Sequence, residues 1–194
     1  MPRISVHDFY DYVLNCYGET AEGLHYNSAG SQQTRFRVLR EMLPENLHGL
    51  SMVDLGCGFG DFLLYLREHG DEIGRYVGID LHERMVEVAR ARTGAEILHG
   101  DVLADPLPEA DWYVCSGALN NLTQDETRTA IERCFGAARR GFVFNVLHGD
   151  DRSGTFNYRT PEEVEAWAAD LGAEVKIVDD YMYRDFTAAL TRAE

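Results

Sequence analysis

The sequence lacks any long hydrophobic run. Apolar residues make up 45% of its 194 positions, a share typical of globular proteins. No stretch approaches the roughly 18 consecutive apolar residues that a membrane span requires. The first residues, Met-Pro-Arg-Ile-Ser, show no signal-peptide pattern. We therefore expect a cytoplasmic protein that has no membrane partner.

Cysteine is scarce and unpaired. Cys16, Cys57, Cys115 and Cys134 form no C-x-x-C motif, which argues against a zinc knuckle and against a disulfide framework. Cys57 lies in a glycine-rich segment and Cys115 in an apolar run, so both are expected to be small buried hydrophobes. The thiols are expected to be reduced, and no metal site is predicted.

Basic charge is also in deficit. Lys and Arg total 18 against 33 Asp and Glu, giving a net charge of −15. Such a protein repels polyanions and releases few counterions on binding phosphates, so nucleic acid is not an expected partner. The arginine cluster Arg35, Arg37 and Arg40 lies on a helical stretch, where solvated charges are common.

Linkers, repeats and low-complexity segments are absent as well, which favours one domain over residues 1–194. From residue 51 onward, apolar runs alternate with amphipathic stretches, the pattern of a doubly wound α/β core with a mostly parallel sheet. Two further helices before residue 51 could form an N-terminal helical lid over residues 1–50. The predicted strands span 51–55, 75–80, 95–99, 111–116, 141–147, 173–179 and 183–191, and the predicted helices span 6–17, 31–43, 60–69, 83–93, 124–138 and 161–171.

The run Met52-Val-Asp-Leu-Gly-Cys-Gly-Phe-Gly-Asp61 carries the strongest functional signal. A buried strand here leads directly into alternating glycines and then a helix, so a ligand can lie against bare backbone and helix N-terminal amides. A dinucleotide fingerprint has the spacing G-x-G-x-x-G. Asp61 occupies the place of its third glycine, which argues against a nicotinamide-dependent oxidoreductase.

The observed pattern, D-x-G-x-G-x-G from Asp54 to Gly60, resembles that of the class I methyltransferases that use S-adenosylmethionine. The resemblance implies a Rossmann-like, seven-stranded, mostly parallel sheet whose last strand is antiparallel. The short separation of the two final predicted strands favours such a closing hairpin independently. The resemblance also implies S-adenosylmethionine as cofactor, with its methionine end near Asp54, Gly56, Cys57, Gly58, Gly60, Ser116 and Gly117, its ribose near Asp80 and Leu81, and its adenine near Asp101 and Val102.

The N-terminal segment and the loop after the fifth major strand supply further candidates. Residues that could bind substrate or the cofactor's carboxylate are Tyr10, Tyr17, Tyr26, Asn27, Gln32, Gln33 and Arg37. Tyr10 and Tyr17, at helical spacing, are expected to pack, and Tyr26, Asn27, Gln33 and Arg37 are predicted to contact cofactor or substrate. Many small-molecule relatives carry a histidine pair where this chain has Asn120-Asn121. His148 is the remaining candidate for a catalytic base, and the adjoining Asp150-Asp151 could orient it or bind a cation.

The expected function is methyl transfer to a small molecule, with an O, N, C or S nucleophile left open. Ser116-Gly117-Ala118-Leu119 stands where amino-group methyltransferases of nucleobases carry an Asn/Asp-Pro-Pro-aromatic motif, which lowers the expectation of nucleic-acid amines. A non-catalytic methyltransferase-like binding module, a NAD(P)-dependent oxidoreductase and a protein methyltransferase are the alternatives. The acceptor, the need for a base, lid movement and the oligomeric state stay open.

Overall fold

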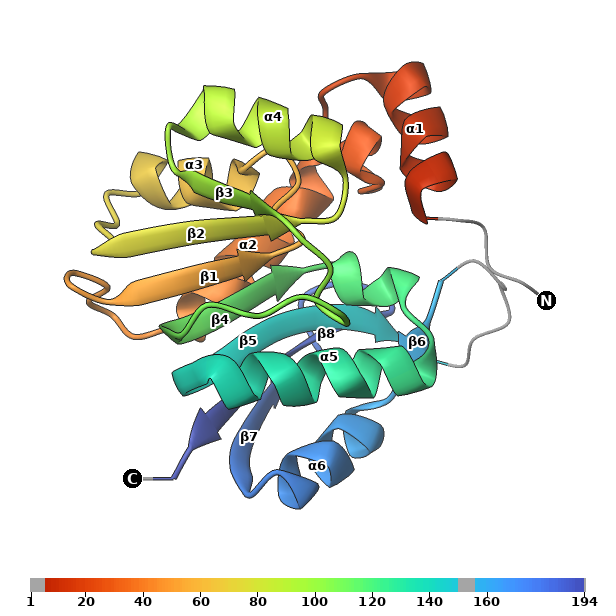
Figure 1. Cartoon of the computed structure of the whole chain (residues 1–194). Coiled ribbons are helices and arrows are strands. Elements are labelled where there is room, and N and C mark those ends of the chain that lie inside the picture. The colour runs from red at the N-terminus through yellow and green to blue at the C-terminus, as the bar shows by residue number, and fades with distance from the viewer. Residues whose placement is uncertain (1–5, 150–155, 194) are drawn as a thin grey trace.

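The computed structural model describes residues 6–149 and 156–193, and its core is one twisted β-sheet (Figure 1). The strands follow the order β3-β2-β1-β4-β5-β8-β7, and β6 pairs with β5 beside this path. β8 runs antiparallel to both of its neighbours, whereas β1 to β6 pair in parallel. The strands are β1 (Ser51–Leu55), β2 (Arg75–Asp80), β3 (Glu96–His99), β4 (Ala110–Ser116), β5 (Ala138–His148), β6 (Tyr158–Arg159), β7 (Ala173–Val178) and β8 (Asp185–Arg192).

Helices cover both faces of this sheet. In Figure 1, α5 and α6 lie on the near face, and α2 crosses behind the strands. The short helix α1 stands beside the carboxyl ends of β1 and β2, at the edge where parallel strands present their loops. The helices are α1 (Val6–Tyr17), η1 (Glu22–Leu24), α2 (Ala29–Glu41), α3 (Asp61–Glu68), α4 (Glu83–Thr93), η2 (Ala118–Asn121), α5 (Gln124–Ala137) and α6 (Pro161–Asp170).

Alternation along the strands builds two hydrophobic cores. In β4, Tyr113 and Cys115 face the core under α5 and α6, while Trp112 and Val114 face the core under α2, α3 and α4. Because successive side chains point to opposite faces, a strand buried on both sides must be apolar throughout. This explains the continuous apolar runs of the sequence and confirms the predicted fold class.

Local signals set most element boundaries. Thr160 and Glu163 form a capping box at the start of α6, with Pro161 in its first turn, as the sequence predicts. α2 begins at Ala29, two residues earlier than predicted, because Ser28 and Ser31 form a capping box. The two-residue strand β6 was not predicted, since so short a segment has no hydrophobic periodicity of its own.

Two findings concern the expectations about membranes and thiols. Within residues 6–149 and 156–193, no helix combines the length and apolarity needed to cross a bilayer. Cys57, Cys115 and Cys134 are buried and Cys16 is exposed, and all four are free thiols. The predicted burial of Cys57 and Cys115 is therefore confirmed.

Candidate functional site

The turn after β1 has the backbone geometry that its glycines allow. Gly56, Gly58 and Gly60 have φ values of 66°, 54° and 78°, in the left-handed region that disfavours residues with a Cβ. The Gly56 and Cys57 amides donate to the Ile79 carbonyl at 2.8 and 3.1 Å, which anchors the turn to β2. A Cβ on Gly56 would lie only 2.2 Å from the Ala118 Cβ. The turn therefore requires glycine at this position.

A cavity of about 370 Å³ opens at the carboxyl ends of the strands, within the size range of small-molecule sites. Its wall combines segments that lie far apart in the sequence: the N-terminal segment, the β1 turn, the ends of β2 and β4, and the loops beside β5 and β8. The predicted site residues that line it are Tyr26, Asn27, Asp54, Gly56, Cys57, Gly58, Asp80, Leu81, Asp101, Val102, Ser116 and Gly117.

Asp54 is a buried acid in the cavity wall, with 2% of its surface exposed. Tyr76 donates its hydroxyl to Asp54 Oδ2 at 2.6 Å. Burial raises the pKa of the Asp54 carboxyl to about 7; the Tyr76 hydrogen bond opposes this shift, and the charges of Asp80 and Asp61 add to it. Its protonation state therefore changes near neutral pH.

Asp80 ends β2 with both carboxylate oxygens held by backbone. The Gly58 amide donates to Oδ2 at 2.8 Å and the His82 amide donates to Oδ1 at 2.9 Å. Burial raises the pKa of this carboxyl, while the two backbone hydrogen bonds lower it. Since each carboxylate oxygen has two lone pairs, a second acceptor position on each oxygen is available to a ligand hydroxyl.

Asp101 follows β3 in a tight turn. Its Oδ1 accepts from the Leu103 amide at 2.8 Å, and its own amide donates to Asp105 Oδ2 at 2.8 Å. These bonds fix the carboxylate at the cavity wall, next to Val102. The end of β3 therefore presents one acid and one apolar side chain together.

Ser116 and Gly117 end β4 and form the middle of the cavity wall. The Tyr26 hydroxyl lies 2.8 Å from Ser116 Oγ and 3.1 Å from the Ser116 carbonyl oxygen. This contact joins the N-terminal segment to the sheet across 90 positions of sequence. Gly117 has a φ of 83°, and a Cβ at this position would lie 3.4 Å from Arg35 Nη1.

Gln33 and Arg37, predicted to contact cofactor or substrate, do not line the cavity. Both are exposed on the outer face of α2, and Arg37 forms a surface ion pair with Glu41 at 2.7 Å. Gln32, which the sequence gives only as a possible contact, and Arg35, for which it predicts no role in the site, line the cavity. The spacing of apolar residues could have predicted this. Gln32 and Arg35 lie four positions before the buried Phe36 and Leu39, so they share the helix face that packs on the sheet.

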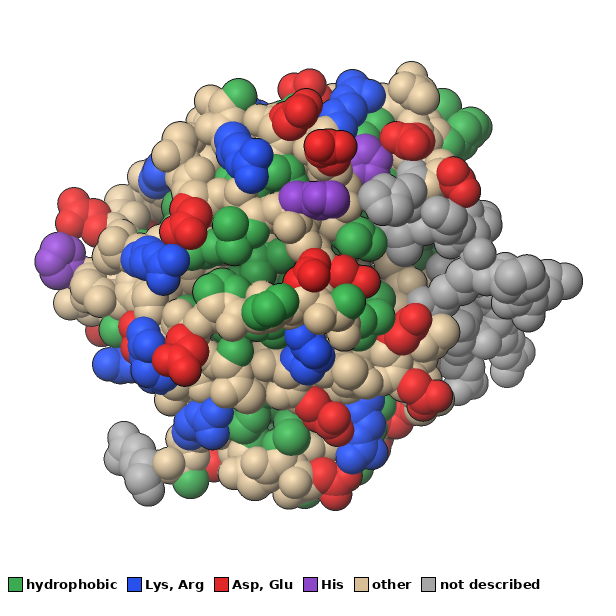
Figure 2. All heavy atoms as spheres, in the orientation of Figure 1, with side chains coloured by type: hydrophobic (Ala, Val, Ile, Leu, Met, Phe, Trp, Pro, Cys, Tyr) green, Lys and Arg blue, Asp and Glu red, His purple; other side chains and the backbone are tan. Residues whose placement is uncertain are grey.

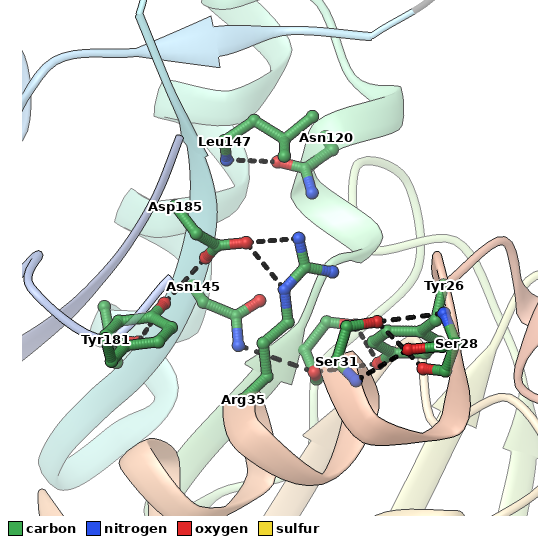
Figure 3. A network of polar contacts seen from close by, with 11 residues as sticks. Tyr26, Ser28, Ser31, Arg35, Asn120, Asn145, Leu147, Tyr181 and Asp185 are labelled. Atoms are coloured by element: carbon green, nitrogen blue, oxygen red, sulfur yellow. Dashed lines mark hydrogen bonds and ion pairs between the residues drawn. The ribbon is translucent and has the colours of Figure 1, made fainter. Parts of the chain in front are cut away.

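Arg35 belongs to a buried polar network (Figure 3). Its Nε donates to Asp185 Oδ2 at 2.7 Å, and its terminal nitrogen Nη2 pairs with the same oxygen. Tyr181 donates to the other oxygen, Oδ1, at 2.6 Å. The guanidinium also lies 5.4 Å from the Tyr26 ring centroid. This network joins α2 to β8 and leaves Arg35 Nη1 directed to the space beside Gly117.

Gly60, predicted near the methionine end, and His148, the candidate base, do not line the cavity either. Gly60 precedes α3, and a Cβ there would lie 2.4 Å from Thr93 Cγ2, so this glycine allows α3 to pack on α4 and does not line the cavity. The His148 ring packs edge-on against Phe186 outside the cavity wall. The neighbouring Asp150-Asp151 pair lies outside the described residues.

Asn120 and Asn121 line the cavity and support it. The Leu147 amide donates to Asn120 Oδ1 at 2.9 Å (Figure 3), which links η2 to β5. Asn121 Nδ2 donates to the Tyr10 hydroxyl at 2.9 Å, which links η2 to α1. Tyr10, for which packing is the favoured expectation and binding the alternative, lines the cavity, and burial raises the pKa of its hydroxyl to about 12.

The surface carries charges of both signs. On the face seen in Figure 2, Arg side chains are scattered among Asp and Glu and form no continuous basic patch. Within the described ranges, no group of three or more His, Cys, Asp or Glu is arranged to hold a metal ion.

The family model for a methyltransferase domain matches residues 52–141, which include the β1 turn and the ends of β2, β3 and β4. A demethylmenaquinone methyltransferase of Lactococcus lactis is 28% identical over 102 residues, covering 50% of this chain and 40% of the relative. A malonyl-[acyl-carrier protein] O-methyltransferase of Pectobacterium atrosepticum is 28% identical over 132 residues, covering 68% and 50%. The chain thus spans about half the length of these curated relatives.

A solved structure shares the fold over most of the chain. Magnesium protoporphyrin IX methyltransferase from Synechocystis PCC 6803, with bound S-adenosylmethionine, aligns with a TM-score of 0.70 and 19% identity. The alignment covers 84% of this chain and 80% of that one. At this identity the likeness establishes the arrangement of strands and helices.

Proposed function

The chain belongs to the class I S-adenosylmethionine-dependent methyltransferases, and from this premise we propose that it transfers a methyl group from S-adenosylmethionine to a small-molecule acceptor. One observation carries the proposal. The glycine turn, the acid ending β2, the acid after β3 and the Ser-Gly pair ending β4 all line one cavity. Relatives named for demethylmenaquinone and for magnesium protoporphyrin support a small-molecule acceptor.

The residues present fit this cofactor. Bare backbone at Gly56 and Gly58 leaves space that a Cβ would fill, and the carboxylates of Asp80 and Asp101 can accept hydrogen bonds from hydroxyl and amino groups. Arg35, with one terminal nitrogen directed into the cavity, suits the carboxylate of the methionine end and takes the role first expected of Arg37. The proposed holders are Asp54, Gly56, Cys57, Gly58, Ser116, Gly117, Tyr26 and Asn27 for the methionine end, Asp80 and Leu81 for ribose, and Asp101 and Val102 for adenine.

S-adenosylmethionine supplies an activated methyl group on a sulfonium, so the protein chiefly has to align the nucleophile and exclude water. The N-terminal segment contributes to both tasks, because Tyr10, Tyr26 and Asn27 line the cavity from outside the sheet. We propose that residues 1–50 act as a cover and that 1–194 form one methyltransferase domain. If the acceptor must lose a proton, His25, which lines the cavity, is better placed than His148 to receive it.

Calorimetric titration tests the cofactor. We expect micromolar binding of S-adenosylmethionine and of its product S-adenosylhomocysteine, and no binding of NADH. Replacing the ribose acceptor, Asp80→Asn, should weaken cofactor binding about tenfold or more, because a hydrogen bond to a charged group is lost. The exposed substitution Asp170→Asn is the matched control. NADH binding in place of S-adenosylmethionine binding would favour the oxidoreductase alternative.

Methyl transfer is tested separately, with labelled S-adenosylmethionine and a cell extract divided at a size cutoff. Label in the low-mass fraction is the expected result. Label in protein would instead indicate a protein methyltransferase. Cofactor binding without transfer to either fraction would favour the non-catalytic module.

A further inference from the structure

Charges of both signs line the cavity. Its acids are Asp54 in β1, Asp61 at the start of α3, Asp80 at the end of β2 and Asp101 after β3. Its arginines are Arg35 on α2, paired with Asp185 of β8, and Arg184 in the turn before β8. Under the proposed function, the acids compensate the charge of the cationic cofactor and Arg35 serves its carboxylate. Arg184 is left for the acceptor.

Within the described part of the chain, Arg184 is the cavity-lining arginine without an acidic partner. The Arg35 charge is offset by Asp185, whose side chain is 1% exposed. No hydrogen bond or ion pair joins the Arg184 side chain to a described residue, since its contact is with the Tyr158 ring, 4.7 Å from the ring centroid. In a chain of net charge −15, a cavity-lining cation without an acidic partner among residues 6–149 and 156–193 requires an explanation.

Arg184, which lines the cavity, has a left-handed backbone conformation. Its φ is 57°, a left-handed value that costs a residue with a Cβ about 1 kcal/mol or more. This conformation comes just before β8, where Asp185 turns inward to Arg35. The Arg184 carbonyl accepts from the His148 amide at 2.9 Å, which fixes the turn to β5. Stacking on Tyr158 then restricts the guanidinium while leaving its N–H edge available to a planar anion.

Apolar groups line the cavity close to this cation in sequence or in space. Tyr158 carries the stacked guanidinium, Met182 and Tyr183 directly precede Arg184, and Phe156 lines the same cavity. The Tyr183 side chain is 90% exposed. An exposed aromatic ring beside a stacked arginine suits a ligand that has both an apolar body and a negative group. We propose that the methyl acceptor is a small carboxylic acid with an aromatic or similarly apolar body, and that Arg184 binds its carboxylate. This inference rests on the proposed function and specifies its substrate class.

Three probes that share one ring system test the charge preference: 4-hydroxyphenylacetate, its neutral primary amide, and the cation tyramine. Each is titrated into protein saturated with S-adenosylhomocysteine, so that the cofactor side is filled. We expect the acid to bind about tenfold more tightly than the amide, the difference expected of one charge-assisted hydrogen-bonded contact, and tyramine to bind most weakly. Arg184→Met should make the acid and the amide bind equally. Arg184→Lys, which keeps the charge without the planar fork, should retain part of the preference.

Arg75→Met is the control, because Arg75 is an exposed arginine paired with Glu96 on β3, away from the cavity lining. This variant should leave the preference for 4-hydroxyphenylacetate over its amide unchanged. Equal or stronger binding of tyramine, no preference for the acid, or a preference that survives Arg184→Met would overturn the inference. Binding of S-adenosylhomocysteine itself is measured first. Its failure would count against the proposed function, whereas its success without an acid preference would count against the Arg184 assignment alone.

Discussion

At the scale of single residues, Asp54 shows how position in a motif and physical environment act together. Its place at the end of β1 puts a carboxyl among apolar strands, with Asp80 and Asp61 nearby. Tyr76 offers one hydrogen bond, which is insufficient to offset the loss of water. The pKa of Asp54 accordingly rises to about 7, so the neutral acid is the favoured form in mildly acidic solution.

This shift predicts a pH dependence of stability. Asp54 has a raised pKa in the folded state, so its favourable contribution is complete below the unfolded pKa near 3.8 and is lost as pH rises through about 7. Asp54→Asn mimics the neutral acid at all pH values. We expect the variant to have the larger free energy of unfolding in urea at both pH 5 and pH 8, with the greater difference at pH 8, because the unfolded carboxyl is already largely ionised at pH 5 while the folded one is not. Glu87→Gln, at an exposed position, should show no such growth of the difference with pH. An unchanged difference between the two pH values would contradict the assignment.

At the scale of elements, the β1 turn joins fold and site. Gly56 combines a φ of 66° with a virtual Cβ that lies 2.2 Å from the Ala118 Cβ. Gly70, after α3, has a φ of 79° but open space around it. Substituting each glycine in turn therefore distinguishes the cost of a left-handed φ, present at both positions, from the cost of a steric clash with the opposite cavity wall, present only at Gly56.

Gly56→Ala should lower the free energy of unfolding by about 2–4 kcal/mol, because left-handed strain and overpacking add. It should also weaken S-adenosylmethionine binding at least about tenfold, since η2 must move away from the turn. Gly70→Ala should cost about 1–2 kcal/mol from strain alone and leave binding intact. Unfolding and calorimetric titration of both variants measure these effects. If Gly56→Ala bound S-adenosylmethionine with wild-type affinity, the β1 turn would not be part of the cofactor site.

Some features of these elements can be predicted from local sequence, whereas others depend on how the elements pack together. The alternation of strands and helices, the apolar strands and the α6 cap follow from periodicity and capping rules, which act locally. The rotation of α2 about its axis does not, because the packing of Phe36 and Leu39 on the sheet sets it and thereby points Gln32 and Arg35 inward. Arg184 could not be predicted, since no residue-level signal marks a left-handed arginine.

At the scale of the whole molecule, acidic charge opposes compactness. With a net charge of −15, the acidic side chains repel one another more strongly in the folded chain than in the expanded chain, because they lie closer together. Surface pairs such as Arg37–Glu41 and Arg128–Glu132 offset this only in part, because exposed ion pairs contribute about 0–1 kcal/mol each. We therefore expect the repulsion among the acids, rather than the attraction within surface ion pairs, to determine how stability changes with salt.

Raising NaCl from 0.02 to 0.5 M should accordingly increase the melting temperature by a few degrees, since salt screens the repulsion between charges more than about 10 Å apart. The triple variant Glu87→Gln, Glu165→Gln, Glu174→Gln removes three exposed acids that form no ion pair with a described residue, so its melting temperature should rise less with salt. Neutralising the exposed arginines Arg37, Arg75 and Arg128 instead should make the rise steeper, because the acidic excess then grows. A melting temperature that falls with added salt would mean that the surface pairs outweigh the net charge.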